Sequence, residues 1–209
     1  MNNEHFKANT SKLVLGLIVL IFGIIVEAAL IIGGRQEEDG IFIIIGGTIF
    51  LAGWFFLIAF SLLSNYFSAA KCIKKSLAKY SEDVIKAHIA SSQELVYSKA
   101  GKSTYFTDRA IVDFQQGVFP YNMIVMAHVT KVKNKNYVTS TTITIYTFDG
   151  EIFPICSKIS SDEAEKYLEL MYKHNPKMII GYSEENLNQR NKLVDDHSAG
   201  KIVIPETTL

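Results

Sequence analysis

The stretch Leu13–Ile32, LVLGLIVLIFGIIVEAALII, decides how this chain of 209 residues is organised. A second apolar run, Ile41–Leu63 with the sequence IFIIIGGTIFLAGWFFLIAFSLL, follows after a short polar loop. About 20 helical residues rising ~1.5 Å each span the ~30 Å hydrocarbon core of a bilayer. The two runs therefore predict a transmembrane helical hairpin within residues 1–64, with both ends of the chain on one side of the bilayer.

The cations around the two runs predict the orientation of the hairpin. Two lysines precede the first run, and the loop between the runs carries one arginine among three acids. Four lysines follow the second run: Lys71, Lys74, Lys75 and Lys79. Because cations are retained on the cytoplasmic side, we expect a multi-pass protein of the cell membrane with both termini in the cytoplasm. Contact with anionic lipid is a second interpretation of the four lysines, which the positive-inside rule already explains.

A cleaved secretory signal is the alternative to a retained first helix. Val26-Glu27-Ala28 is the nearest match to a cleavage site. The charge at its centre, the apolar residues that follow it and the second long run all favour a membrane helix. Cys72 and Cys156 then lie on the cytoplasmic side, where free thiols are expected.

Glycines recur at a seven-residue spacing in both runs, at Gly16 and Gly23 in the first and at Gly46 and Gly53 in the second. Seven residues are nearly two helical turns, so each pair lies on one face where another backbone can approach closely. We predict that these glycines form the packing seam of the hairpin. Assembly of several copies through the same seam is the alternative.

Glu27 is the single ionisable residue within the two runs. A carboxylate inside a membrane span is by default a candidate ion or proton site. Glu27 also lies near the end of its run, within reach of water or of Arg35. With one acid in two helices, a conducting path needs several copies around an axis. An oligomeric transport or conductance subunit that uses Glu27 is therefore the alternative function.

Apolar residues at spacings of three and four predict an amphipathic juxtamembrane helix over residues 65–92. They are Tyr66, Ala70, Ile73, Leu77, Tyr80 and Val84. The stripe is compatible with packing on the following domain, with a short coiled coil between two copies, or with a position along the bilayer.

From residue 93 to residue 194 the pattern predicts a single cytoplasmic domain, mostly of short strands. Asp149-Gly150 is the strongest hairpin signal. Ser160 and Glu163 form a capping box at the start of a helix, and a trailing helix begins near Glu184. Residues 195–209 are expected to be a flexible tail. The predicted strands are Leu95–Tyr97, Thr104–Phe106, Ala110–Phe114, Gly117–Pro120, Met123–Val132, Thr139–Phe148 and Glu151–Cys156.

Four segments of this domain resemble bacterial PH-like domains. They are Tyr105–Val112, Gly117–Tyr121 with the apolar Met123–Val125, the hairpin Thr147–Gly150 and the acidic helix Asp162–Tyr172. The resemblance covers residues 94–174, and with the paired spans the chain is similar to small bacterial membrane proteins that carry such a domain. It implies a membrane-anchored α+β protein whose small antiparallel β-barrel or sheet is capped by a C-terminal helix. It also implies a binding or scaffolding module rather than an enzyme.

Catalytic and cofactor motifs are absent from the sequence. The five histidines, His5, His88, His128, His174 and His197, lie in different predicted elements without metal-ligand spacing. No glycine-rich phosphate loop and no nucleophile elbow is present. We therefore expect no catalytic residue, no metal and no cofactor. Nucleic acid is not an expected partner, because the alternating lysines Lys131, Lys133 and Lys135 are typical of the solvated face of a strand.

The function that the sequence favours is a scaffold that presents the PH-like domain near the bilayer. Its expected partners are the lipid bilayer and either a cytoplasmic protein or further copies of the chain. Exposed strand edges bind extended peptides by strand addition. Thr142 and Thr144, in the most regular alternating strand, are the candidate binding edge.

Overall fold

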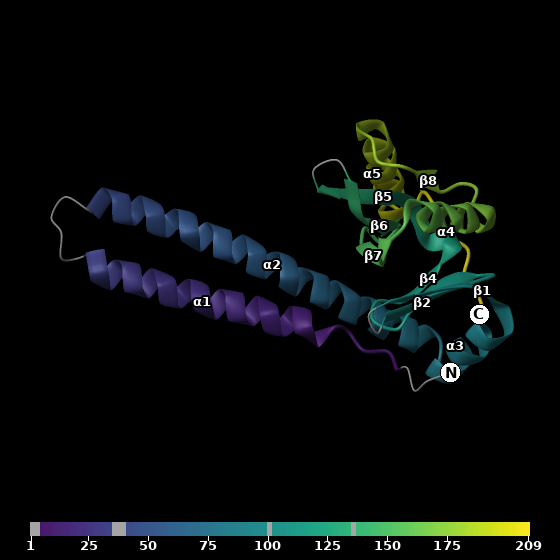
Figure 1. Ribbon diagram of the computed structural model, residues 1–209. Coiled ribbons are helices and arrows are strands. Elements are labelled where there is room, and N and C mark those ends of the chain that lie inside the picture. Colours follow the sequence, from purple (N-terminus) through teal and green to yellow (C-terminus); the bar gives the residue numbers. More distant parts are fainter. Residues whose placement is uncertain (1–4, 35–40, 100–101, 135–136) are drawn as a thin grey trace. The chain divides into compact units, whose positions relative to one another are not determined.

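The computed structural model describes residues 5–34, 41–99, 102–134 and 137–209, which form two compact units. One unit is the helical hairpin, Ala8–Ala70. The other is the domain, made of Lys71–Leu209 together with the described part of Met1–Lys7. The chain is thus an α+β protein with two long apolar helices and antiparallel sheets (Figure 1).

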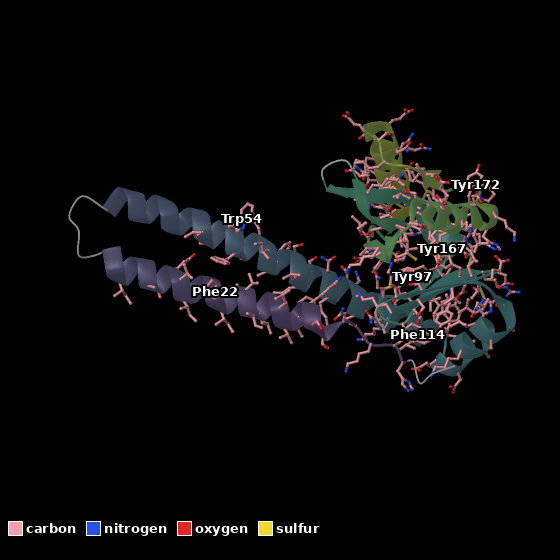
Figure 2. All side chains as sticks on the ribbon, in the orientation of Figure 1. Phe22, Trp54, Tyr97, Phe114, Tyr167 and Tyr172 are labelled. Carbon is pink, nitrogen blue, oxygen red and sulfur yellow. The ribbon has the colours of Figure 1, made fainter. Side chains whose placement is uncertain are left out.

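The hairpin consists of α1, Thr10–Gly34, and α2, Ile41–Lys79, both long and apolar enough to cross a membrane. Only 11% and 6% of their most apolar windows are buried, so these are not core helices of a water-soluble fold. Phe22 and Trp54, labelled in Figure 2, are 55% and 58% exposed. Contiguous apolar surface of this extent is rare in water and ordinary in lipid.

Two of the four predicted seam glycines lie where the helices meet. A Cβ added to Gly16 would lie 3.1 Å from Leu63 Cδ2, and one added to Gly23 would lie 2.9 Å from Phe55 Cβ. Gly53 has no atom within 4 Å of that position, so its assignment to the seam is wrong. The surroundings of Gly46 fall outside the described side chains.

The juxtamembrane segment is not one helix, in contrast to the prediction for residues 65–92. α2 continues without a break to Lys79, and a separate helix, α3, spans Glu82–Ser92. The break lies at Ser81, whose Oγ accepts a hydrogen bond from Val84 N (3.4 Å). A serine followed by acids is a strong helix start, and here it overrides the continuous apolar period. Leu77 and Val84 of the predicted stripe are accordingly exposed.

The first sheet has the strand order β1-β2-β3-β4. Its strands are β1 Gln93–Lys99, β2 Lys102–Thr107, β3 Ala110–Asp113 and β4 Gly117–Pro120. Asp113 closes the β3–β4 turn: its Oδ1 accepts from Gln115 N (2.8 Å) and its carbonyl accepts from Gln116 N (3.1 Å). Gly117 ends this turn at φ 128°, a conformation that favours glycine. The turn joins the two strands predicted at Ala110–Phe114 and Gly117–Pro120.

The second sheet has the order β7-β6-β5-β8 and follows a short helix, η1 Tyr121–Met123. Its strands are β5 Ile124–Asn134, β6 Tyr137–Thr147, β7 Ile152–Ile159 and β8 Ile179–Ile180. The Asp149-Gly150 hairpin between β6 and β7 is confirmed, with Gly150 at φ 82°. Helices α4, Ser161–His174, and α5, Glu184–Ser198, flank β8 in the chain. The Ser160–Glu163 capping box at the start of α4 is also confirmed.

The main core lies between the two sheets and includes the apolar face of α4. It contains Phe106 and Phe119 from the first sheet and Ile143 and Ile145 from the second, and Figure 2 labels Tyr97 and Tyr167 within it. A second cluster packs α3 on the outer face of the first sheet, and a third packs α5 on the outer face of the second. The domain is therefore layered as α3, first sheet, second sheet and α5.

The sheets do not close into one barrel, which corrects the finer part of the fold prediction. First-sheet side chains, rather than strand pairing, bond the carbonyls of β7. Thr104 Oγ1 donates to Ile155 O (3.0 Å) and Gln116 Nε2 donates to Pro154 O (2.7 Å). Because these donors satisfy the β7 main chain, the two sheets stay separate while their shared core is sealed.

The end of the chain also differs from the predicted flexible tail at residues 195–209. α5 continues to Ser198, into the range predicted as a tail. The residues that follow form no helix or strand, yet Pro205–Leu209 are held against the domain by several hydrogen bonds. Such long-range bonds leave no local signal in the sequence.

Candidate binding surface on the second sheet

One side of β5 lacks a partner strand over most of its described length. β8 pairs in parallel with Met126 and Ala127 only, and Gly181 N donates to Ala127 O (3.0 Å). Successive residues of a strand direct their main-chain groups to alternate sides. Val129 and Lys131 therefore point their N–H and C=O groups to the same side as Ala127, past the end of β8. We call this part of β5 the free β5 edge.

The candidate residues Thr142 and Thr144 do not form a strand edge. β6 is an interior strand, paired with β5 on one side and with β7 on the other. Thr142 lies between Thr130 and Ser157 in the register. The predicted edge is therefore wrong, because β6 pairs with both of the strands that adjoin it in the chain.

The two threonines instead contribute to the outer face of the second sheet, next to the free β5 edge. Met126 and Tyr146 lie on this face beneath α5, and strand alternation places His128, Thr130, Thr142 and Thr144 on it as well. His128 is the cross-strand neighbour of Thr144, and Thr130 is that of Thr142. The face beyond α5 is thus polar and β-branched.

His128 is the most unusual side chain of this face. It is only 8% exposed, and its Nε2 lies 3.0 Å from Thr130 Oγ1. Its ring centroid is 5.5 Å from that of Tyr146 and 4.9 Å from that of Tyr182. Burial lowers the pKa of His128, which keeps the imidazole neutral at neutral pH. Among the described residues, its buried Nδ1 has no hydrogen-bond partner.

Arg190 of α5 fixes the other end of this aromatic group. Its guanidinium carbon lies 5.1 Å from the ring centroid of Tyr146, and its Nη2 donates to Gly150 O (3.1 Å). The cation and the ring attract each other, and the hydrogen bond ties α5 to the β6–β7 hairpin. Tyr182 and Ile180, 63% and 42% exposed, form an apolar rim beside the free β5 edge.

A second histidine, which the sequence left unassigned, has a serine and an aspartate beside it. Ser92 Oγ lies 3.1 Å from His88 Nδ1, and Asp108 Oδ1 lies 3.4 Å from His88 Nε2. Ser92 Oγ also donates to the carbonyl of His88 (2.7 Å), and Thr107 Oγ1 lies 3.0 Å from Nε2. These contacts join the end of α3 to β2. The hydroxyl hydrogen of Ser92 is donated to the main-chain carbonyl of His88 in the same helix. The geometry is that of a structural tie rather than of an activated nucleophile.

Neither metal binding nor thiol chemistry gains support from the described residues. They contain no cluster of three or more histidine, cysteine or acidic side chains that could hold a metal. Cys72 and Cys156 are free thiols, and burial raises the pKa of Cys156. A protonated, buried thiol is a poor nucleophile.

Three of the four juxtamembrane lysines pair with acids of the domain. Lys71 Nζ lies 3.1 Å from Glu151 Oε1, and Lys75 pairs with Asp149 in the same hairpin. Lys79 Nζ lies 3.0 Å from Glu206 Oε1. Lys74 is exposed. Anionic lipid therefore competes with protein carboxylates for three of these side chains, and lipid contact stays a prediction.

Glu27 lies on α1 with a half-exposed side chain. Its expected neighbour Arg35 falls outside the described residues. The structure brings Glu27 together with no other predicted site residue among those described.

No protein-family model, curated protein or solved structure matches the chain. The function is therefore inferred from the geometry of the chain itself.

Proposed function

We propose that this chain is a membrane-anchored binding module whose PH-like domain presents the free β5 edge to an extended segment of a cytoplasmic protein. The observation that carries the proposal is the unpaired side of β5 at Val129 and Lys131. Main-chain groups on such an edge bind an added strand of almost any sequence, and flanking side chains select among candidates. Tyr182 and Ile180 supply an apolar rim for that selection.

The arrangement of the domain supports its PH-like character. Four antiparallel strands, three further antiparallel strands and then α4 follow one another in the chain. The two sheets enclose one core, with α4 packed into it. Antiparallel strands followed by a helix that caps the core are compatible with what the sequence resemblance implies.

The two ends of the hairpin support anchoring by two membrane spans. Phe6 packs on Phe114 with ring centroids 4.7 Å apart, and Lys7 N donates to Phe114 O (2.8 Å). The segment before α1 and the domain after α2 thus belong to one compact unit. Two spans return the chain to the side where it entered, and the flanking lysines favour the cytoplasm for that side.

Strand addition is tested by Lys131→Pro in the full-length protein, with Lys131→Ala as the matched control. Proline removes the outward N–H without removing a β5–β6 hydrogen bond, because Lys131 N–H points away from β6. A photoreactive side chain at the exposed Thr130 would record the partner in cells. We expect capture to fall about tenfold with Lys131→Pro, the equivalent of one lost hydrogen bond, and to persist with Lys131→Ala.

Two controls make the result decisive. Thermal unfolding of both Lys131 variants should match that of the parent protein, whereas Thr142→Pro should remove a hydrogen bond between β6 and β5 inside the sheet and unfold the domain. Equal capture by the proline and alanine variants, both folded, would show that the edge is not the binding surface.

The transport alternative rests on Glu27 alone, and the described residues provide no contact of its side chain that adds support. Glu27→Gln in reconstituted vesicles tests it: unchanged ion or proton flux rules out a role for this carboxyl group.

A further inference from the structure

Residues 205–209 lie against the domain as an extended ligand would. Three side chains from different elements donate to their carbonyls. Asn122 Nδ2 donates to Pro205 O (2.7 Å), Arg109 Nη1 donates to Thr208 O (2.8 Å), and the Tyr80 hydroxyl donates to Thr207 O. Donors aimed at main-chain carbonyls are the means by which proteins hold a peptide without regard to its side chains.

Further contacts depend on the side chains of this segment. Glu206 pairs with Lys79 (3.0 Å), and Thr207 Oγ1 donates to Asn122 Oδ1 (2.9 Å). Leu209 packs on the cluster between α3 and the first sheet, near Ile85, Val112 and Phe114. The surface that binds Pro205–Leu209 thus recognises an acid, a hydroxyl and a leucine in order. We call it the tail groove.

The segment that connects α5 to the tail groove is weakly held. Val203 is 83% exposed, and Gly200 at φ 73° has open space around it. Residues 199–204 form hydrogen bonds with the last turn of α5, through Asp195, Asp196 and His197. None of the three core clusters contains a residue between 195 and 208. Departure of the tail therefore uncovers a core cluster only where Leu209 packs on it, and the connector can serve as a hinge.

We infer that the tail groove is a peptide-binding site and that its intermolecular occupant is the Pro205–Leu209 segment of a second copy of this chain. The tail of a second copy can make the same contacts with the groove as the chain's own tail. Exchange of tails between two copies therefore replaces each contact with an identical one. An unrelated peptide would have to match the acid, the hydroxyl and the leucine independently. The six connecting residues can extend to about 20 Å, which gives the tail reach beyond its own domain.

The inference concerns the first sheet and leaves the free β5 edge unoccupied. It rests on the proposed membrane anchoring in one respect, the high local concentration of copies in one bilayer. Tail exchange pairs copies without covering the surface proposed for the partner.

Exchange is tested by complementation between two full-length copies in vesicles. The donor copy carries Arg109→Ala and Asn122→Ala, which disable its groove, and a photoreactive side chain at the exposed Thr208. The acceptor copy lacks residues 205–209 and keeps its groove. We expect crosslinks from position 208 to the acceptor segment around Arg109, at least tenfold above those between two donor copies.

Folding and binding are measured separately. Both copies should unfold at nearly the parent temperature, and a full-length acceptor with Leu209→Asp replaces the truncated one if truncation destabilises the domain. The synthetic peptide IPETTL, residues 204–209, is the probe for the groove itself. It should bind the acceptor copy at least tenfold more tightly than the intact protein, whose groove is occupied.

Two results would overturn the inference in different ways. Peptide binding without crosslinks between donor and acceptor would show a real groove whose occupant is not a second copy. Failure of the folded acceptor to bind the peptide would show that the tail contact is purely structural. Neither result bears on Lys131→Pro, so the proposed function stands or falls on its own experiment.

Discussion

The two sheets of the domain share one core, but the β5 edge of the second sheet is less covered than the edges of the first. On the first sheet, Ser76 Oγ accepts from Val118 N of β4 (2.9 Å), and the Tyr167 hydroxyl donates to Val96 O of β1 (3.3 Å). On the second sheet, β8 covers β5 only as far as Ala127. The difference shows where the fold uses its own chain to satisfy an edge and where it leaves an edge for another strand.

The outer faces of the two sheets also differ in how completely they are covered. α3, Phe6 and Leu209 cover the apolar face of the first sheet, whereas α5 covers only the part of the second that includes Met126 and Tyr146. The remaining part of the second sheet carries His128 and the threonines. A covered first sheet and a partly open second sheet fit the proposal that strand addition takes place at the free β5 edge.

Gly117→Ala should have the largest effect, because it breaks the closed edge of the first sheet. A Cβ at this position would lie 2.8 Å from Cys72 Sγ, and φ of 128° is strained for any other residue. We expect a loss of about 3 kcal/mol in the free energy of unfolding, from strain and the displaced helix together. Chemical denaturation of the full-length protein in detergent measures it.

Gly200→Ala is the matched control, with a positive φ of 73° but no atom within 4 Å. It should cost about 1 kcal/mol, the strain alone. Equal losses for the two variants would mean that the contact between Cys72 and Gly117 does not hold the β4 edge.

Lowering the pH should weaken the second sheet through His128. Burial holds the pKa of this histidine below its ordinary value, so the unfolded chain takes up the proton first as the pH falls. Stability contributed by the neutral side chain is present above about pH 6.5 and is lost below it, by no more than about 1.4 kcal/mol per pH unit for one group. Unfolding measured between pH 7.5 and 5 gives the slope.

His128→Leu serves as the control, since it keeps an apolar contact with Tyr146 and Tyr182 and cannot titrate. Its slope between pH 7 and 5 should be smaller than that of the parent protein. An unchanged slope would assign the pH dependence to another group, with His88 the first to examine because burial also lowers its pKa.

Local signals in the sequence were reliable because the interactions behind them are local. Asp149-Gly150 forms its hairpin, and Ser160 and Glu163 form both hydrogen bonds of the capping box. The strands of both sheets also lie close to their predicted ranges. Each of these features depends on residues within a few positions of one another.

The sheet edges were not predictable for the opposite reason. The edge on the far side of β5 depends on Ile179–Ile180, a strand of two residues contributed after α4. For Thr142 and Thr144, the Asp149-Gly150 hairpin predicts only one of the two neighbours of β6, the strand β7. The tail groove likewise depends on Arg109 and Asn122, which lie far from residue 205 in the chain. His128 had one usable signal, a lone histidine in an apolar strand, which is typical of a buried side chain.

The smallest expected effect concerns the tie between the edge strand β1 and the end of α4. His174 Nε2 lies 2.7 Å from Glu94 Oε2, and the His174 ring stacks on Tyr121 with centroids 4.7 Å apart. The His174 hydrogen bond, helped by Lys173, lowers the pKa of Glu94. The carboxylate therefore contributes stability above its ordinary pKa of about 4.3, and this contribution is lost as the pH falls through the lowered value.

A double-mutant cycle of Glu94→Gln and His174→Phe isolates this contact, since phenylalanine keeps the stacking on Tyr121. We expect a coupling of about 0.5–1 kcal/mol at pH 7 that decreases as the pH falls below about 4.3. Both single variants should leave capture at the free β5 edge unchanged. If loosening β1 instead makes the first sheet capture strands as well, the contrast between the two sheets reflects how firmly each edge is covered rather than a division into a structural and a binding half.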